Sequence, residues 1–433
     1  MLEESQKDLT FFAVPCRNLP CLDGIGPTAV VNAAGFGRMA CCFRWKRFVI
    51  LAHGGEQKLR SSMKIAILAT IELLRRYLWN MLLLFSELSV VYITDLTSLY
   101  TWTCSRCNDL TEGFEMVELI VDVENCLQAF VGIDHVLNST IIAIRGTSEN
   151  RNVDQDKQLN NLYACVLVRK DASYPKNGNC CLLSLFSCFL GNIKNWIQDL
   201  FWVQLDLNYP GVKDAKVHHG FYRAYHNTIL RYGITSAVQR IKELYGDIQI
   251  MVTGHSMGGA IASFCALDLS VNYGVEHVQL MTFGQPRVGN PAFAAYFSKQ
   301  VPDTIRVTHA KDIVPHLPPY YASFSKRTYH HFPREVWLHR AEVDGEEYIE
   351  EKICDGSGED PTCSRSVYGT SLANHLEYYG VDLEADAWGS CKALVDASVS
   401  QYYLEYNGSI ILWREPTTLH SKIVSPRSVG SSL

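Results

Sequence analysis

IQIMVTGHSMGGAIASFCALD, residues Ile248–Asp268, decides the fold of this 433-residue chain. The apolar run at its start, Ile248–Val252, predicts a buried strand, and the Ala- and Leu-rich run Ala260–Leu269 predicts a helix. Between them lies a G-x-S-x-G pattern centred on Ser256. A serine on so sharp a turn has a strained backbone, and the residues two positions away must be small for strand and helix to pass. The stretch therefore predicts a strand, a tight turn with a serine at its tip, and a helix.

The glycines of this pattern indicate a nucleophilic serine. Gly254 and Gly258 flank Ser256 at the spacing that the nucleophile elbow of α/β-hydrolases requires. The turn lifts the Ser256 hydroxyl out of the sheet. It also directs the N–H of Met257, at the start of the helix, toward the place where an oxyanion would form. The alternative is a Gly-rich helix start with Ser256 as its capping residue. The strand before the turn and the small-residue helix after it favour the elbow.

The elbow stretch VTGHSMGGAIASFCALDL resembles that of the class 3, fungal-lipase-like lipases, in their plant-type branch. This resemblance implies an α/β-hydrolase fold, a central mostly parallel sheet flanked by helices, with a lid helix. It also implies serine-dependent hydrolysis of acylglycerols or related lipid esters through an acyl-enzyme, with no metal and no cofactor. Further similar stretches keep the family's order between about residues 91 and 391: YITDLTSLYTWTCSRC, IIAIRGTSE, NWIQDLFWVQLDLNYPG, VHHGFYRAYHNT, MTFGQPRVGNPAFA, RVTHAKDIVPHLPP and YHHFPREVW.

The family-like part, residues 91–392, is predicted to be one domain with a single interruption. In the family, RGT leads almost directly into an N-W-I-x-D-L segment, whereas residues 151–191 intervene here. A structureless loop of this length is uncommon in a compact domain, and its composition favours extra translated sequence, as from a splicing difference, over a designed loop. Residues 1–90 and 393–433 do not resemble the family. We expect no regular structure before about residue 60 and a partly disordered tail.

Composition limits the classes of protein to which the chain can belong. With 47% hydrophobic and 19% charged residues it is typical of a globular protein, and its net charge of −6 gives no basic footprint for nucleic acid. Fifteen cysteines are many for a cytosolic enzyme. Two close pairs, Cys104/Cys107 and Cys354/Cys363, would be disulfides in a secreted lipase. A zinc or redox site at the first pair stays open, but no second set at metal-ligand spacing supports it.

The first ninety residues leave the compartment undecided. The chain begins Met-Leu-Glu-Glu, which is acidic where a secretory signal is basic. The apolar stretch Lys64–Ile93 is broken by charged residues, so it favours an amphipathic helix that packs on the core over a membrane-associated helix. The resemblance implies the secretory pathway or an extracellular location. It also implies a lipid ester and a lipid–water interface as partners, with peripheral membrane contact left open.

The chain order of α/β-hydrolases places an acid and then a histidine after the serine. The strand expected at Thr304–Thr308 is followed by Asp312, at the end of a strand where the acid belongs. Asp312 also begins DIVPHLPP, which matches the family pattern. The competing acids are Asp303, before the strand, and Asp344, in a charged hairpin-like stretch.

The predicted base is His375. It lies in SLANHLEYYG, which resembles the catalytic-histidine segment of the family, although Asn374 stands where the family often has an acidic residue or serine. The histidines at 316, 330 and 331 follow the acid too closely to come from a separate C-terminal loop. We expect these three to shape the cleft or the core.

Two further elements rest on the resemblance. The strand expected at Asn138–Arg145 leads to Thr147, which would supply the second oxyanion donor. The segment Asn192–Phe201 would be the lid, although a core helix is the alternative reading of its helical spacing. The apolar residues of this lid are Ile193, Trp196, Ile197 and Leu200.

Two other functions remain open for this sequence. A phospholipase or acyltransferase would use the same triad of Ser256, Asp312 and His375. An inactive lipid-binding homologue is favoured by the insert beside Thr147 and disfavoured by the complete triad.

Overall fold

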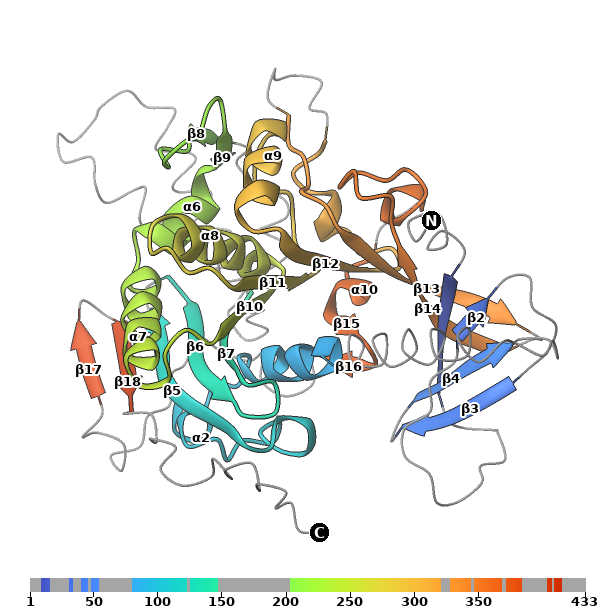
Figure 1. Ribbon diagram of the computed structural model, residues 1–433, viewed down its shortest axis with the longest axis horizontal. Helices are drawn as coiled ribbons and strands as arrows, with labels where there is room; N and C mark the ends of the chain where they lie inside the picture. The colour runs from blue at the N-terminus through green and yellow to red at the C-terminus, as the bar shows by residue number, and fades with distance from the viewer. Residues whose placement is uncertain are drawn as a thin grey trace, which may run out of the picture.

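The computed structural model describes backbone strands near the N-terminus and most of the family-like region. Fourteen strands within the described residues form one mixed sheet, and helices lie on both of its faces (Figure 1). The described residues are 9–15, 31–33, 40–45, 48–53, 80–122, 125–146, 203–320, 328–343, 346–367, 371–383, 403–406 and 409–414.

The middle of the sheet is parallel. Its strands are apolar and almost wholly buried because helices cover both faces, as is usual for parallel sheets. The three strands that the sequence predicts at Asn138–Arg145, Ile248–Val252 and Thr304–Thr308 are confirmed as β7, β10 and β12. In spatial order the five parallel strands are β7 (Ser139–Ile144), β10 (Gln249–His255), β11 (Val278–Phe283), β12 (Asp303–His309) and β13 (Glu335–Val343).

Antiparallel strands extend the sheet beyond β7. The order continues through β6 (Leu127–Asp134), β5 (Phe114–Asp122), β18 (Ser409–Trp413) and β17 (Tyr403–Tyr406). The last two strands belong to the tail, so the tail is not merely an appendage: β18 pairs with β5 along five residues.

At its other end the sheet continues into strands near the N-terminus. β13 forms a hairpin with β14 (Glu346–Ile353), and β1 pairs with β14. The expectation of no regular structure before residue 60 is therefore wrong. The strands there are β1 (Leu9–Pro15), β2 (Val31–Ala33), β3 (Ala40–Trp45) and β4 (Phe48–His53).

The helices on one face of the sheet form a large core with it. Residues 219–245 form two helices: Asn227 is the C-cap of the first, and Thr228 caps the second through its side chain. The four helices are α6 (His219–His226), α7 (Ile229–Tyr245), α8 (Met257–Val271) and α9 (Pro291–Gln300). Figure 1 shows α8 beside β10 and β11 and α7 beside β5.

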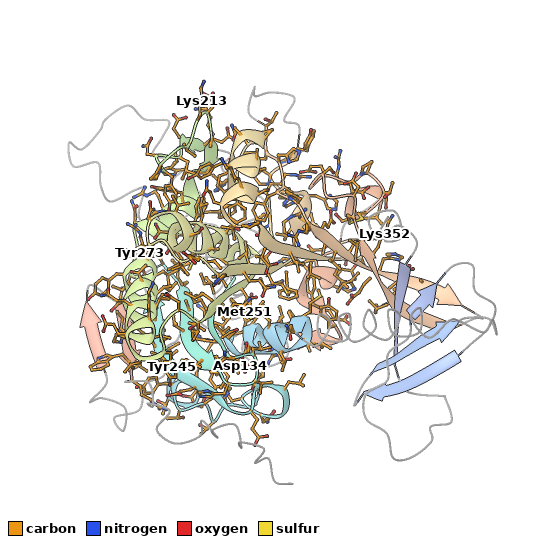
Figure 2. The ribbon with its side chains drawn as sticks, in the orientation of Figure 1. Asp134, Lys213, Tyr245, Met251, Tyr273 and Lys352 are labelled. Carbon is orange, nitrogen blue, oxygen red and sulfur yellow. A yellow bond between two sulfur atoms is a disulfide. The ribbon has the colours of Figure 1, made fainter. Side chains whose placement is uncertain are left out.

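A helix that covers residues 80–90 packs on the opposite face. Its apolar residues Leu84, Phe85 and Leu88 are fully buried and share a core with Met251 of β10, which Figure 2 shows at the centre of the molecule. The predicted packing of an N-terminal helix on the core is thus confirmed for residues 80–90, whereas residues 64–79 lie outside the described part. Among the described residues, no helix is long and apolar enough to cross a membrane.

Two small hairpins and two short helices complete the described structure outside the large sheet. Two short hairpins are separate from the large sheet: β8 (Gln204–Asp206) with β9 (Lys216–His218), and β15 (Glu377–Tyr378) with β16 (Val381–Asp382). The short helices are α2 (Leu96–Tyr100) and α10 (Ala373–Leu376).

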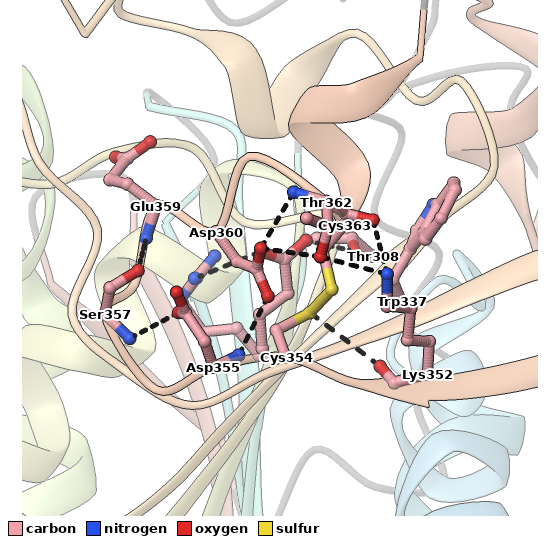
Figure 3. The surroundings of a disulfide bond; sticks show 12 residues. Thr308, Trp337, Lys352, Cys354, Asp355, Ser357, Glu359, Asp360, Thr362 and Cys363 are labelled. Carbon is pink, nitrogen blue, oxygen red and sulfur yellow. Dashed lines mark hydrogen bonds and ion pairs between the residues drawn. A yellow bond between two sulfur atoms is a disulfide. The ribbon is translucent and has the colours of Figure 1, made fainter. Parts of the chain in front are cut away.

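Both predicted cysteine pairs are disulfides. Cys104 is bonded to Cys107, and Cys354 is bonded to Cys363. Figure 3 shows the second bond closing a loop in which Asp360 accepts hydrogen bonds from the backbone N–H groups of Asp355 and Thr362. The first pair is therefore not arranged as a zinc site.

Candidate active site

Ser256 stands on the turn between β10 and α8, in a backbone conformation that ordinary residues avoid. Its φ is 58° and its ψ is −131°. A Cβ at Gly254 would lie 2.3 Å from the carbonyl oxygen of Gly258, and one at Gly258 would lie 2.3 Å from that of Ile144. Both positions therefore exclude a side chain, which is the packing that the G-x-S-x-G pattern predicts.

Asp312 and His375 form a buried pair at the carboxyl end of the sheet. Asp312 follows β12 and is 2% exposed, and His375 lies in α10 and is 0% exposed. His375 Nδ1 donates to Asp312 Oδ2 at 2.8 Å. That bond fixes the tautomer of the neutral imidazole, so the lone pair available to accept a proton is on Nε2.

The carboxylate of Asp312 accepts two further hydrogen bonds, and one of the donors, Tyr378, is not among the predicted site residues. The Tyr378 hydroxyl donates to Oδ2 at 2.7 Å, and the Val314 N–H donates to Oδ1 at 2.8 Å. Burial, with the negative Asp312 beside it, raises the pKa of Tyr378 well above its usual value, so the phenol remains a donor. A signal for Tyr378 is present in the sequence, since it follows His375 by three residues in the family-like motif.

Gly284 closes over the Asp312–His375 pair. It ends β11 in the left-handed region, at φ +57°. A Cβ there would lie 2.8 Å from both Asp312 Oδ2 and His375 Nδ1. Glycine is required here both for the backbone conformation and for the space that the pair occupies.

His255, the residue before Ser256, links the elbow to the segment that carries His375. His255 precedes Ser256, its ring centroid lies 4.4 Å from that of His375, and its Nε2 donates to the His375 carbonyl oxygen at 2.7 Å. Ser256 Oγ and His375 Nε2 are both buried, and neither has a hydrogen-bond partner among the described residues. These two buried polar atoms are therefore available to bond to each other or to a substrate.

The acid loop and the histidine loop are also joined through their backbones. Ser371 N donates to Lys311 O at 2.7 Å, and His309 Nδ1 contacts the carbonyl oxygen of Asn374 at 3.0 Å. The Asn374 side chain, a departure from the family pattern, accepts from the Lys311 N–H at 3.4 Å. Residues that are sixty or more positions apart in sequence are thereby joined by hydrogen bonds.

The rival acids and histidines lie elsewhere. Asp303 is exposed at the start of β12, and Asp344 falls outside the described residues. His331 Nε2 contacts Pro315 O at 2.8 Å, and burial lowers the pKa of His331 well below its usual value. The carbonyl oxygen of His316 accepts from Arg287.

The remaining predicted site residues are only partly placed. Met257 is the first residue of α8, so its N–H lies at the positive end of the helix dipole. Thr147 and the lid residues Ile193, Trp196, Ile197 and Leu200 lie outside the described residues.

A parallel sheet with a strained serine on an elbow and a buried acid–histidine pair defines an α/β-hydrolase. The family model "Lipase (class 3)" matches residues 189–322. A lipase of Rhizomucor miehei is 36% identical over 205 residues, 46% of this chain and 53% of that protein. A secreted mono- and diacylglycerol lipase of Fusarium solani is 33% identical over 43% of this chain and 53% of its own length. The chain thus spans about half the length of these curated relatives.

The solved structures agree with the sequence comparisons. The triacylglyceride lipase of Rhizomucor miehei superposes with a TM-score of 0.52 at 28% identity, covering 73% of this chain and 97% of that chain. A fungal lipase solved as an inhibitor complex gives a TM-score of 0.51 at 29% identity, over 73% of this chain and 98% of that one. These matches support a class 3, fungal-lipase-like family for the chain. Its assignment to the plant-type branch stays a prediction.

Proposed function

We propose that this protein is a serine-dependent lipase that hydrolyses acylglycerols or related lipid esters through an acyl-enzyme. The observation that carries the proposal is the buried Asp312–His375 pair, with the unpaired Nε2 of His375 beside the elbow of Ser256. A title among the matched structures describes a serine protease triad as the catalytic centre of a triacylglycerol lipase, which supports the same roles here.

The reaction begins with proton transfer to His375. Ser256 Oγ attacks the ester carbonyl carbon while His375 Nε2 takes the hydroxyl proton, and the carbonyl oxygen becomes an oxyanion. Asp312 stabilises the imidazolium through Nδ1. Collapse of the tetrahedral species breaks the ester C–O bond, and His375 returns the proton to the leaving alcohol. A water molecule, deprotonated by His375, then cleaves the acyl-enzyme and restores Ser256.

The oxyanion is proposed to bind to backbone N–H groups on both sides of the serine. Met257 would contribute from the start of α8, and Thr147, which lies outside the described residues, would contribute from the sequence that follows β7. The loss of one such donor typically lowers kcat by about 100- to 1000-fold. This mechanism uses no step that requires a metal or a cofactor.

The similarity to these lipases favours a lipid ester, bound at a lipid–water interface, as the substrate of this protein. The matched proteins include a secreted mono- and diacylglycerol lipase, and one matched structure is titled as a model for interfacial activation. Because Ser256 and His375 are shielded from solvent, an ester reaches them only after a covering segment moves, and the proposed lid at Ile193–Leu200 would serve this purpose. We propose the secretory pathway or the extracellular space as its location, in keeping with the secreted relative and the disulfides.

Hydrolysis of p-nitrophenyl butyrate and p-nitrophenyl laurate by the purified chain, beside Ser256→Ala, tests the proposal. We expect turnover that is abolished in the variant and that increases for the longer ester above its solubility limit. A folded wild-type chain with no turnover of either ester would instead favour the inactive lipid-binding homologue. Acyl transfer to an added alcohol, measured against release of free fatty acid, separates an acyltransferase from a lipase.

A further inference from the structure

A hydrogen-bonded chain runs behind the elbow and uses two buried residues to which the mechanism above gives no role. They are Tyr92, after the helix that covers residues 80–90, and His255, inside the G-x-S-x-G pattern. The Tyr92 hydroxyl lies 2.7 Å from His255 Nδ1, and the Gly146 N–H donates to the Tyr92 hydroxyl oxygen at 3.1 Å. At the far end, His255 Nε2 donates to the carbonyl oxygen of His375.

The directions of these bonds follow from the partners. A carbonyl oxygen can only accept, so His255 must carry its proton on Nε2 and present a lone pair at Nδ1. Tyr92 therefore donates to Nδ1 while its oxygen accepts from Gly146. Burial, with His375 nearby, lowers the pKa of His255 well below its usual value, so the ring stays neutral. Each of the three donors in this hydrogen-bond series, on Gly146, Tyr92 and His255, thus has an acceptor.

Further hydrogen bonds, all made by Gln128, hold the Tyr92 and Gly146 end of this hydrogen-bond series in place. Gln128 Nε2 donates to the carbonyl oxygens of Val91 and Ile93, on either side of Tyr92, at 2.8 and 2.9 Å. Gln128 Oε1 accepts from Arg145, the neighbour of Gly146, at 3.1 Å. A Cβ on Gly146 would lie 2.6 Å from the His255 carbonyl oxygen and 2.7 Å from the Tyr92 hydroxyl, so the backbones of Gly146 and His255 and the side chain of Tyr92 meet without a gap.

We propose that Tyr92 and His255 are positioning residues that set the distance between the two halves of the catalytic machinery. One half is the backbone at Gly146, directly before the proposed oxyanion donor Thr147, and the other is the main chain of His375. A single phenol and a single imidazole join them across the elbow. The inference rests on the proposed ester hydrolysis and names the residues that align it.

The chemistry explains why the alignment matters. In the proposed mechanism the oxyanion donors and the proton acceptor His375 must reach the same ester group at the same time. Displacement of a reacting group by about 1 Å can lower a rate by about 100-fold. Tyr92 and His255 contact neither the substrate nor the reacting atoms. Loss of their hydrogen bonds should therefore lower kcat and leave KM almost unchanged.

Tyr92→Phe is the direct test, and Tyr100→Phe is its matched control. Tyr100 is equally buried, but its hydroxyl donates to Trp413 O at 2.7 Å in a contact between α2 and β18. We expect Tyr92→Phe to lower kcat by about 10-fold or more, with KM within about twofold of wild type. We expect a similar loss of affinity for an alkylboronic acid, which needs both the oxyanion donors and His375. Tyr100→Phe should keep wild-type kcat whatever its melting temperature.

His255 provides the second test, which also decides the matter if Tyr92→Phe does not fold. His255→Gln keeps an N–H donor near the position of Nε2, whereas His255→Phe removes it. Higher kcat in the Gln variant than in the Phe variant supports the proposal, and equal kcat in the two overturns it. A Tyr92→Phe variant as active as Tyr100→Phe also overturns it. A wild-type chain that is folded but hydrolyses no ester overturns the proposed function, and the positioning inference with it.

Discussion

Two buried aspartates in this molecule have opposite tasks. Asp268, in α8, is paired with Arg231 through two bonds of 2.8 and 3.0 Å and also accepts from Asn272, Tyr209 and Tyr225. Asp312 accepts from His375, Tyr378 and Val314. Both carboxylates are almost wholly removed from solvent, but only Asp268 has a permanent cation against it.

The difference separates a charge that holds the fold from a charge that is kept for chemistry. Arg231 neutralises Asp268 at all times, and it holds the pKa of Asp268 below its usual value despite burial. In the proposed mechanism, the partner of Asp312 is the imidazole of His375, which becomes a full cation only when it takes the proton of Ser256. The attraction between Asp312 and His375 is therefore larger in the transition state than at rest, which is the condition for lowering a barrier.

The largest effect is expected when each aspartate is replaced by asparagine. Asp312→Asn should lower kcat by roughly 10,000-fold, as loss of the acid does in serine triads, because the amide no longer fixes the tautomer of His375. Asp268→Asn should leave the activity per folded molecule near wild type. It should cost about 2 to 4 kcal/mol of unfolding free energy, less than a fully buried pair, because Arg231 is 37% exposed and can be rehydrated. Ester kinetics and urea denaturation of both variants measure this. Equal activity losses would break the comparison.

Gly284→Ala tests how closely the Asp312–His375 pair is packed. The added methyl would collide with both side chains, and we expect a loss in kcat of about 100-fold from the displaced base. Gly274→Ala is the control: Gly274 also has a positive φ, of +63°, but nothing lies within 4 Å of its Cβ position. The control should be destabilised by backbone strain alone and remain active. Similar kinetics in the two variants would show that strain, not contact with the pair, is responsible.

Tyrosine-to-phenylalanine changes beside each aspartate test the same difference between Asp312 and Asp268, with smaller expected effects. Tyr378→Phe removes a donor from Asp312, and about a 10-fold lower kcat is expected from the loss of one hydrogen bond to a charged group. Tyr225→Phe removes the 3.2 Å bond to Asp268 and should cost about 1 kcal/mol of unfolding free energy without changing kcat. If Tyr225→Phe lowers kcat as much as Tyr378→Phe does, the two aspartates are not separate in function.

The smallest effect is a dependence on pH. A depressed folded-state pKa stabilises the protein above the unfolded value of about 3.9, and this contribution is lost as the pH falls through the folded value. The difference in unfolding free energy between wild type and Asp268→Asn should therefore be constant from pH 8 to pH 5 and shrink on acidification below about pH 4. Denaturation curves at several pH values provide the measurement. A difference that grows on acidification would contradict the sign of the shift.

The sequence predicts the residues whose signals are local. Ser256 is marked by its glycines and Asp312 by its place after a strand, whereas His375 could be chosen among several histidines only through the family resemblance. Gly284, Tyr92 and His255 acquire their roles from contacts with residues far away along the chain. The Tyr92–His255 bond, for example, joins positions 163 apart. No periodicity encodes such a contact.

The errors in fold prediction also have physical causes. The break between α6 and α7 depends on the Thr228 cap, and apolar spacing continues across it, so periodicity alone reads one helix. The strands β1–β4 and β17–β18 lie at the edges of the sheet and come from the parts of the sequence that do not resemble the family. The elbow region was predictable because it is buried on both sides and tightly constrained.

The measurement that tests the central claim most directly is labelling by a fluorophosphonate, followed by mass spectrometry of the labelled peptide. The account predicts one label per chain, on Ser256, formed rapidly in wild type and in Asp268→Asn and far more slowly in Asp312→Asn. Labelling of another residue, or equal rates in the two asparagine variants, would contradict the assignment of Ser256, His375 and Asp312 as one catalytic unit.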